Sequence, residues 1–471
     1  MSCDTQGKRD CTCKLAALYN LAITIPHHRI LIVSEIRIRI MKIDVEVISR
    51  EIIKPATSTP DHLHHYKFSF LDQLTPSSFY IPLIYFYSLD HKLSNNEKST
   101  HLKTSLSKVL HHYYPLAGFI KENYIDCKNG GVLVLEAQVN CQLSEILQSP
   151  NPDKFVNKFL PDDANNLVLA IQVNFFSCGS VAIGVLISHK IADASSILTF
   201  VKNWAETGRG NGDNIVPPKF VGATLFPPKD GIRSLGTFVA ENVVLNRFVF
   251  TDSKIAALKG KYVISSTDKG RIYPTRYEAL SCFLFSRFAA STEVKEGHKK
   301  SYLLISPVNL RKRMDPPLLD DCFGNISGSA KTFISLEDDI GENGYSYGLV
   351  NKLKEEIKKI NKDYVKKLED GILDFDLNTM EVSIEDKPLK QEMDFFSCSS
   401  YCRFPTYEAD FGWGRPVWVA FGDLSQRNST VLMDNRTGDG IEAWIHLTKE
   451  DMAIFETDEE LLTYASPTSC P

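Results

Sequence analysis

The chain has 471 residues, of which 43% are hydrophobic and 24% are charged, and its formal net charge is −5. That length exceeds one ordinary hydrophobic core, so the composition indicates a soluble globular protein of two domains. It excludes proteins that follow a nucleic-acid backbone with a long basic block, and no apolar run reaches the ~20 residues of a membrane-spanning helix. We therefore expect neither a nucleic-acid partner nor a membrane partner.

The eleven cysteines are scattered along the chain and have no paired C-x-x-C spacing. This distribution indicates free, mostly buried thiols in a reducing compartment, so we expect a cytoplasmic protein. The close pairs, Cys11 with Cys13 and Cys398 with Cys402, have no two further ligands nearby. We expect no metal site.

Four segments follow from the composition along the chain. Residues 1–40 are interpreted as an extension outside the core, 41–207 as a first domain, 208–235 as a linker rich in Gly and Pro, and 236–471 as a second domain. In the first domain the hydrophobic pattern predicts a helix at 99–112 and strands at 43–48, 131–137, 167–173 and 181–188.

The second domain repeats this alternation. Its pattern predicts strands at 244–250, 302–310, 417–421, 429–433 and 440–447, and helices at 275–289, 349–368 and 452–464. Both halves are typical of mixed α/β layers, which predicts two domains of similar size with a cleft between them.

The most informative segment runs from His189 to Asp193. It follows the apolar run 181–188 and precedes a helical pattern, so the histidine is expected where a buried strand turns into a helix. A histidine held there can move a proton near neutral pH, and Asp193 is placed to cap the helix. The His-x-x-x-Asp spacing is common by chance, so other motifs must decide its meaning.

Several separated motifs support a functional interpretation. They are Leu71-Asp72-Gln73-Leu74, Tyr114-Pro115-Leu116-Ala117-Gly118, His189-x-x-x-Asp193, Asn309 to Met314 with Gly324-Asn325, Asp410-Phe411-Gly412-Trp413-Gly414, and Gly440 to Trp444. From residue 42 onward this ordered set resembles the plant BAHD acyltransferases, which use acyl-coenzyme A. The resemblance implies two α/β domains of chloramphenicol-acetyltransferase-like topology. Between them a channel would hold His189, with coenzyme A entering on one side and the acceptor on the other.

The chemistry of such a reaction needs a base. An alcohol has a pKa far above 7 and must lose its proton as it attacks a thioester, which a neutral imidazole at His189 can accept and then return to the departing thiolate. No Gly-x-Ser-x-Gly segment supplies a serine nucleophile. We therefore expect direct transfer of the acyl group. The resemblance implies the substrates, acetyl being the favoured acyl group and a hydroxyl of a specialised plant metabolite, such as an alkaloid or terpenoid alcohol, the acceptor. An N-acyltransferase acting on an amine and a non-catalytic metabolite-binding relative remain alternatives.

Asp193 allows two interpretations. It could orient His189 through a hydrogen bond, or it could form a buried ion pair with Arg311, whose fork-shaped guanidinium suits a carboxylate. The resemblance favours the ion pair, so Asp193 and Arg311 are expected to support the site structurally.

The segment around Asp410 also has two interpretations. Its glycines suggest a tight turn that Asp410 locks, whereas a catalytic role would have Asp410 assist proton handling. In the second case Trp413, beside Gly412, would donate its indole N–H to the developing oxyanion.

Coenzyme A phosphates require cations or backbone N–H groups. The candidate binding residues are Arg276, Lys312, Arg313 and Ser400, for which solvated surface positions are the alternative. Acyl-CoA is expected as co-substrate, with no permanently bound cofactor, and the protein is expected to be a monomer. The chain departs from the family pattern at Phe119, Phe285 and Tyr401, which places substrate preference in question rather than the reaction class.

Overall fold

The computed structural model describes residues 43–467 apart from 129, 150, 163, 165, 233–241, 267–269, 299, 336–346, 373–382, 385–386, 389–392 and 425. Residues 43–471 group as one compact unit and residues 1–42 as another. The expected extension at 1–40 therefore lies outside the described residues, and the domain boundary expected at 208–235 stays a prediction.

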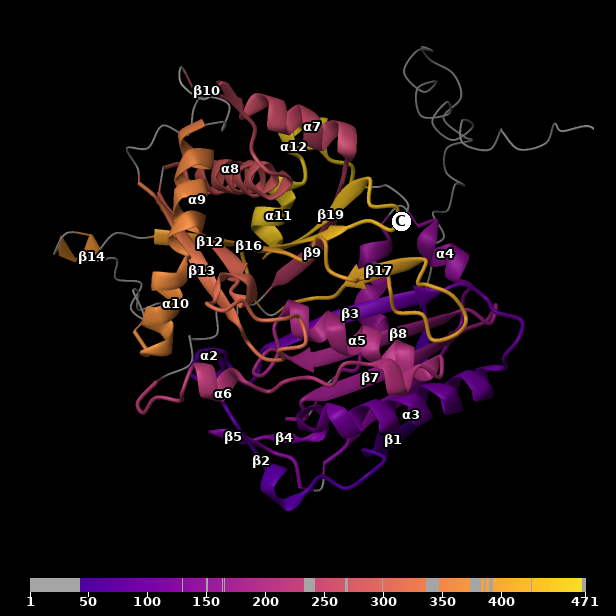
Figure 1. Cartoon of the computed structure of the whole chain (residues 1–471). Helices are drawn as coiled ribbons and strands as arrows, with labels where there is room; N and C mark the ends of the chain where they lie inside the picture. Colours follow the sequence, from indigo (N-terminus) through magenta and orange to yellow (C-terminus); the bar gives the residue numbers. More distant parts are fainter. Residues whose placement is uncertain are drawn as a thin grey trace, which may run out of the picture. The chain divides into compact units, whose positions relative to one another are not determined.

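The first sheet has six strands in the order β1-β6-β7-β8-β3-β17. β6 and β7 pair in parallel, and every other neighbouring pair is antiparallel. Figure 1 shows that β17, from near the end of the chain, lies beside strands from the first half. The strands are β1 (Val45–Ile53), β3 (Tyr80–Tyr87), β6 (Val132–Val139), β7 (Leu169–Phe176), β8 (Val181–Ser188) and β17 (Trp418–Phe421).

Burial follows position in this sheet. β7 is buried at every residue and β8 at nearly every residue, as expected for central strands with continuous apolar sequence, whereas the edge strand β1 alternates. The helices α3 (Asn95–His112) and α5 (Ala194–Gly208) are joined by Trp204, whose Nε1 donates to Ser105 Oγ at 3.1 Å. The end of β8 is therefore buried within the first sheet, and α5 packs against α3.

The second sheet also has six strands, in the order β13-β12-β16-β18-β19-β9. A continuous apolar core covers it, in which Phe285 and Phe288 of the long helix α8 (Arg276–Glu296) pack on Phe396. The strands are β9 (Val243–Thr251), β12 (Ser301–Asn309), β13 (Ser327–Ile334), β16 (Met393–Ser400), β18 (Ser429–Asp434) and β19 (Gly440–Thr448). Mixed sheets covered by helices confirm the predicted α/β class.

A buried cluster around Trp418 joins the two sheets. Trp418 of β17 stacks between Phe86 and Trp444 at ring-centroid distances of 5.0 and 5.8 Å. Its indole Nε1 donates to Glu442 Oε2 at 3.3 Å, and Glu442 accepts from Arg247 Nη1 at 3.0 Å. Because both charged side chains are buried and paired, this cluster fixes β17 against β9 and β19.

The remaining elements are short or lie outside the two large sheets. The helices are α2 (Phe70–Leu74), α4 (Leu143–Leu147), α6 (Gly222–Leu225), α7 (Asp252–Lys261), α9 (Tyr347–Lys359), α10 (Lys362–Glu369), α11 (Lys449–Phe455) and α12 (Glu459–Tyr464). The 3₁₀ helices are η1 (Asp61–Leu63), η2 (Tyr114–Ala117), η3 (Pro152–Phe159), η4 (Gly212–Asn214) and η5 (Arg311–Arg313). The small sheets contain β2 (His65–Lys67), β4 (Phe119–Ile120), β5 (Tyr124–Asp126), β10 (Ile264–Ser266), β11 (Gly270–Ile272), β14 (Ser383–Ile384) and β15 (Lys387–Pro388).

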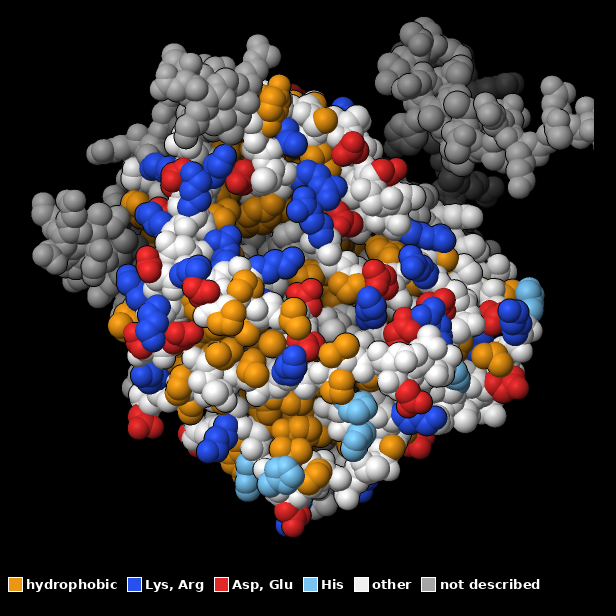
Figure 2. All heavy atoms as spheres, viewed as in Figure 1, with side chains coloured by type: hydrophobic (Ala, Val, Ile, Leu, Met, Phe, Trp, Pro, Cys, Tyr) orange, Lys and Arg blue, Asp and Glu red, His pale blue; other side chains and the backbone are white. Residues whose placement is uncertain are grey.

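The described ranges contain no helix with the length and apolar composition needed to cross a membrane. Within the same ranges no three or more His, Cys, Asp or Glu side chains are grouped so that they could hold a metal ion. On the face shown in Figure 2, basic and acidic side chains are interspersed.

Two predicted helices are each divided into two helices in the structure. The helix predicted at 349–368 is two helices, α9 and α10, because Asn361 accepts hydrogen bonds from the N–H groups of Asp363 and Tyr364 and so caps a new start. The helix predicted at 452–464 is likewise divided into α11 and α12, with Asp458 as the second cap.

Replacing Trp418 with Ala should lower the free energy of unfolding by about 3–5 kcal/mol, the usual effect of removing a buried aromatic side chain. Urea unfolding followed by fluorescence or circular dichroism measures this change. As a control, Leu319→Ala removes a side chain that is 65% exposed and should change stability by less than about 0.5 kcal/mol. A loss below 1 kcal/mol for Trp418→Ala would show that the cluster does not join the sheets energetically.

Candidate functional site

His189 lies directly after the end of β8. Its backbone N–H donates to Phe79 O at 2.8 Å, and its ring stacks on the Phe79 ring with centroids 5.2 Å apart and planes 12° apart. Four residues later Asp193 caps α5 by accepting from the Ser196 N–H at 3.0 Å. The strand, the stacked ring and the capped helix together hold the imidazole in one place, as the sequence predicted for this junction.

A cavity of about 200 Å³ surrounds the imidazole. One wall comes from the first sheet and α5, and the other from β12, β13, β16 and β18 of the second sheet. Its polar lining is rich in hydroxyl groups, which belong to Ser195, Ser327, Ser397, Ser399, Ser400, Ser429 and Thr430. His189 is therefore placed between the two sheets, in a space with many neutral hydrogen-bonding groups.

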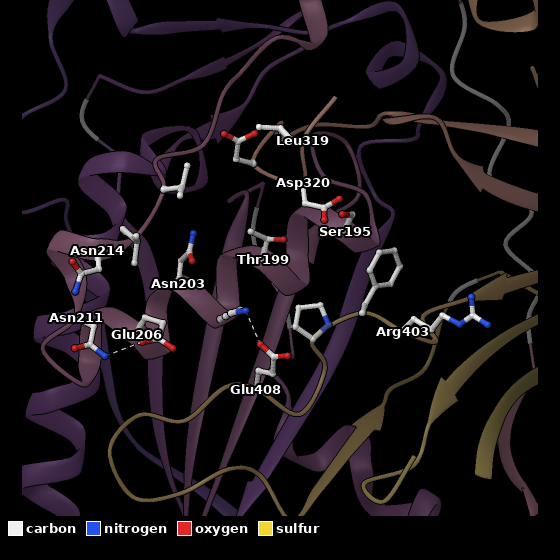
Figure 3. Close-up of a pocket in the computed structure, with 16 residues that line it drawn as sticks. Ser195, Thr199, Asn203, Glu206, Asn211, Asn214, Leu319, Asp320, Arg403 and Glu408 are labelled. Atoms are coloured by element: carbon white, nitrogen blue, oxygen red, sulfur yellow. Dashed lines mark hydrogen bonds and ion pairs between the residues drawn. The ribbon is translucent and has the colours of Figure 1, made fainter. Parts of the chain in front are cut away.

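A larger trough of about 750 Å³ follows α5 away from this cavity (Figure 3). Ser195 and Phe404 line both spaces, so the trough and the cavity adjoin there. An ion pair of 2.6 Å between Lys202 and Glu408 joins α5 to the loop after β16 across the trough. The acidic residues of the lining are Glu206, Asp320, Asp321 and Glu408, and the basic residues are Lys202 and Arg403.

The pKa of His189 lies below its ordinary value. Burial of the ring is the main cause, since it disfavours the charged imidazolium. The His189 carbonyl, the Asp193 carboxylate and the Asn325 side chain act in the opposite direction but do not offset the burial. The imidazole is therefore neutral at pH 7 and able to accept a proton.

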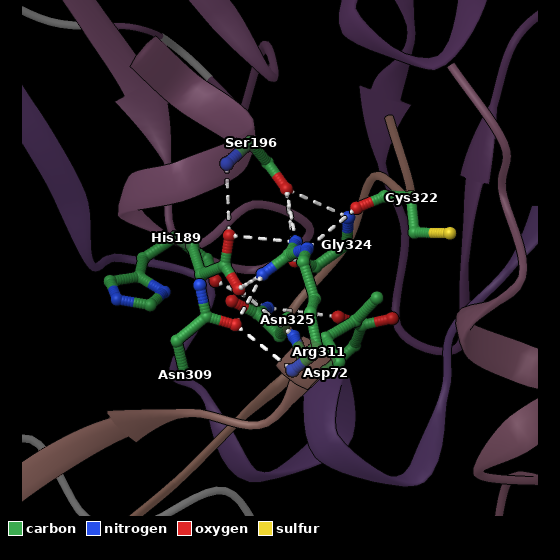
Figure 4. A network of polar contacts seen from close by, with 10 residues as sticks. Asp72, His189, Ser196, Asn309, Arg311, Cys322, Gly324 and Asn325 are labelled. Atoms are coloured by element: carbon green, nitrogen blue, oxygen red, sulfur yellow. Dashed lines mark hydrogen bonds and ion pairs between the residues drawn. The ribbon is translucent and has the colours of Figure 1, made fainter. Parts of the chain in front are cut away.

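The ion pair between Asp193 and Arg311 is buried beside the cavity (Figure 4). Arg311 Nη1 donates to Asp193 Oδ2 at 2.7 Å and Nη2 donates to Oδ1 at 3.1 Å, a bidentate contact. The Asp193 carboxylate also accepts from the N–H groups of Ser196 and Ile326. Although burial alone would raise the pKa of Asp193, Arg311 and these hydrogen bonds lower it below its ordinary value.

These four contacts fill the acceptor sites of the Asp193 carboxylate, which has about four lone-pair positions. The triad-like interpretation requires a hydrogen bond from the His189 ring to the Asp193 carboxylate. No acceptor site of the carboxylate is left for that bond. The contacts of Asp193 therefore fit the second interpretation, an ion pair with Arg311.

Asn325 is the site residue to which sequence reasoning assigned no role. Its side-chain Nδ2 donates to the His189 carbonyl oxygen and to Asp72 Oδ1, both at 2.8 Å. Asp72 is buried on α2, and burial raises its pKa to about 6 against opposing hydrogen bonds from Ser69 and Asn325. Both residues belong to motifs noticed in the sequence, but spacing alone could not predict that they meet.

The segment containing Asp410 is not brought to His189. Tyr87, at the far end of β3, donates its hydroxyl to Ala409 O, whereas Ser188 pairs with Tyr80 at the opposite end of that strand. Seven residues of strand separate these ends, which is roughly 20 Å. The Asp410 carboxylate instead accepts from the N–H groups of Gly412 and Gly414 at 2.8 and 3.0 Å, within its own turn.

The turn requires its two glycines. Gly412 and Gly414 have φ angles of 109° and 100°, in the region that favours glycine. Trp413 stacks on Phe411 with centroids 5.7 Å apart, and its Nε1 is buried with no hydrogen-bond partner in the described part of the chain. Neither Asp410 nor Trp413 lines the cavity around His189, so the geometry supports the structural interpretation of this motif.

Of the four candidate coenzyme A residues, Ser400 lines the cavity. Arg276 contacts Asp434 at 3.3 Å, Arg313 donates to the carbonyl oxygens of Ile357 and Ile360, and Lys312 is exposed. The cavity brings none of these three cations to His189.

The positions that depart from the family pattern lie in three different surroundings. Tyr401 lines the cavity around His189. Phe285 belongs to the core of the second sheet, and Phe119 is 38% exposed on β4. Of these three departures, Tyr401 is therefore the one placed to contact a substrate.

Comparisons with known proteins agree with this arrangement. Residues 43–462 match the Transferase family. The chain is 35% identical to stemmadenine O-acetyltransferase of Catharanthus roseus and 36% identical to vinorine synthase of Rauvolfia serpentina, over 88% of this chain and 96% of each relative. It is also 36% identical to a limonoid 7-O-acetyltransferase of Citrus sinensis, over 90% of this chain and 99% of that protein.

Solved structures give the same result for the fold. The crystal structure of vinorine synthase has a TM-score of 0.76 at 35% identity and covers 90% of this chain and 99% of its own. F. graminearum TRI101, solved with coenzyme A and T-2 mycotoxin, shares the fold at 14% identity with a TM-score of 0.65, over 86% of this chain and 100% of its own. The predicted chloramphenicol-acetyltransferase-like fold is confirmed. The chain therefore belongs to the Transferase family, the BAHD acyltransferases, and is an acyl-CoA-dependent O-acyltransferase.

Proposed function

We propose that this protein transfers an acetyl group from acetyl-CoA to a hydroxyl of a bulky alkaloid or terpenoid alcohol, with His189 as general base. The observation that carries the proposal is the neutral imidazole of His189 in a cavity that adjoins the trough along α5. The relatives act, by their names, on stemmadenine and on limonoids, which supports this acceptor class.

The reaction needs one base and no covalent enzyme intermediate. As the acceptor oxygen attacks the thioester carbonyl carbon, the imidazole takes the hydroxyl proton, and a tetrahedral intermediate forms. When the carbon–sulfur bond breaks, the same proton passes to the coenzyme A sulfur. The products are an ester and free coenzyme A, and the imidazole is again neutral.

The two spaces differ in the charged groups that line them, and this difference supports a proposal for which substrate each one holds. Acyl-CoA is strongly anionic, whereas the trough is lined by four carboxylates and two cations. We therefore assign the trough to the acceptor and the hydroxyl-rich cavity to the thioester end of the pantetheine arm, whose amides suit such a lining. A volume of about 750 Å³ is large enough for a multi-ring acceptor, and about 200 Å³ favours a short acyl group.

Further features support the remaining expectations. The seven described cysteines are free thiols, in accord with a reducing compartment such as the cytoplasm. Asp193 and Arg311 support the site through their ion pair, and Asp410 shapes its own turn.

His189→Ala should fold and bind coenzyme A with unchanged affinity, yet lose about 10²–10⁴-fold in kcat because the general base is gone. Release of free thiol from acetyl-CoA in the presence of a panel of alcohols and amines measures turnover, and calorimetry measures coenzyme A binding. Turnover within about twofold of the unsubstituted protein would refute His189 as the base. If the unsubstituted protein binds coenzyme A but no acceptor of the panel leads to release of thiol, the chain is a binding protein.

The activity should fall on the acidic side of neutrality. The base works only when neutral, so kcat/KM declines as the pH drops through the pKa of His189, and burial places this pKa below the ordinary 6.5. The decline should therefore be centred below pH 6.5. Measurement of kcat/KM from pH 4.5 to 8 tests this, and a decline centred above 6.5 contradicts it.

Asp193→Ala and Arg311→Ala should each destabilise the protein by about 3–5 kcal/mol, because each leaves the other buried charge without its partner. Urea unfolding measures the loss, and activity should fall with it. The double variant should lose less than the sum of the two single losses, because the unpaired charge is gone. Additive losses would show that the two side chains do not act as a pair.

A further inference from the structure

We propose that Asn325 is a positioning residue for the base: its side-chain amide holds the His189 imidazole, and Asp72 holds the amide. This inference rests on the proposed role of His189. It adds two residues from separate parts of the chain to the reaction, neither of which is expected to touch substrate.

The contacts of Asn325 fix the orientation of its amide. Both N–H groups of Nδ2 are in use, since they donate to His189 O and to Asp72 Oδ1. Its Oδ1 and the Nδ1 of His189 are both buried, and neither atom has a hydrogen-bond partner among the described residues. One N–H···O bond from His189 Nδ1 to Asn325 Oδ1 would satisfy both atoms.

The electrostatics of the ring agree with that bond. The Asn325 side chain favours the protonated imidazole and so raises the pKa of His189 against the larger effect of burial. A proton held at Nδ1 leaves the lone pair of the neutral ring at Nε2. This is the tautomer that can accept a proton from an acceptor hydroxyl.

Asp72 keeps the amide from turning over. Its Oδ2 accepts the backbone N–H of Ser69 at 2.8 Å in the capping box of α2, which leaves Oδ1 for Asn325. A carboxylate is an acceptor only, so it selects the N–H₂ side of the amide. The charged groups near this arrangement are Asp72 on α2, Lys190 and Asp193 after β8, and Arg311 on η5.

The buried ion pair sets the position of Asn325 itself. On one side, the Gly324 N–H donates to Ser196 Oγ at 3.0 Å, and Ser196 Oγ accepts from Arg311 Nη2. On the other side, the Ile326 N–H donates to Asp193 Oδ2 at 3.1 Å. Asp193 and Arg311 therefore act on His189 through Asn325, although neither forms a hydrogen bond to the ring in the structure.

The test replaces Asn325 with Ala and measures the pH profile. We expect kcat to fall about 10-fold or more, because the ring is no longer held in one tautomer, while the KM for acetyl-CoA stays within about threefold. The acidic decline of kcat/KM should also move to lower pH, because one of the three groups that favour the protonated ring is lost. The position of that decline does not depend on how much of the variant is folded.

Asn174→Ala is the matched control. Asn174 is a fully buried amide that bonds to backbone carbonyl groups of Phe159 and Ala182, and it lies outside the cavity. It should lower stability to a similar extent but leave kcat per folded enzyme and the acidic decline unchanged. A decline that stays in place in Asn325→Ala, with kcat reduced only as in Asn174→Ala, would overturn the positioning role.

Asp72→Asn tests the second half of the proposal. It should lower kcat, as Asn325→Ala does. The double variant should be no slower than Asn325→Ala alone, because the two residues act as one unit. Multiplied losses would overturn the link from Asp72. If His189→Ala loses turnover but Asn325→Ala has unaltered kinetics, the role of His189 as base stands and the positioning role of Asn325 is refuted.

Discussion

The buried pair of Asp193 and Arg311 is the interaction on which the site depends. It joins the start of α5, in the first half of the chain, to the segment between β12 and β13 in the second half. Burial removes both charged side chains from water, which costs free energy unless hydrogen bonds within the protein replace those to water. Here Arg311 also donates to Cys322 O, Ser196 Oγ and Asn309 Oδ1, so each end of the pair is satisfied and the two halves meet in one register.

The His189 ring takes its properties from these surroundings. The ring stacks on Phe79, burial lowers its pKa, and hydroxyl groups line the space around it. Beyond Ser195 and Phe404 lies the trough, which the ion pair of Lys202 and Glu408 crosses.

Local pattern predicted much of this site. The apolar run at 181–188 coincides with β8, and Asp193 caps α5 as its position suggested. The contact between Asn325 and Asp72 could not be predicted, because 253 residues separate them along the chain. Their neighbours Leu71 and Ile326 belong to one buried core cluster, which forms only in the folded protein. The distance of Asp410 from His189 was equally hidden, since β17 enters the first sheet from the other half of the chain. The hydrophobic periodicity also predicted one helix through Asn361, whereas in the structure Asn361 caps the start of a new helix, α10.

The place of β17 has a consequence for how the molecule can be divided. Its four residues complete the edge of a sheet whose other five strands are made more than 200 residues earlier, and Trp418 seals the junction. A nascent chain can therefore finish its first sheet only after most of the second has been synthesised. Chimaeras that exchange halves between relatives must move the segment 418–421 together with the first half, or they will join a foreign edge strand to a sheet that evolved with another.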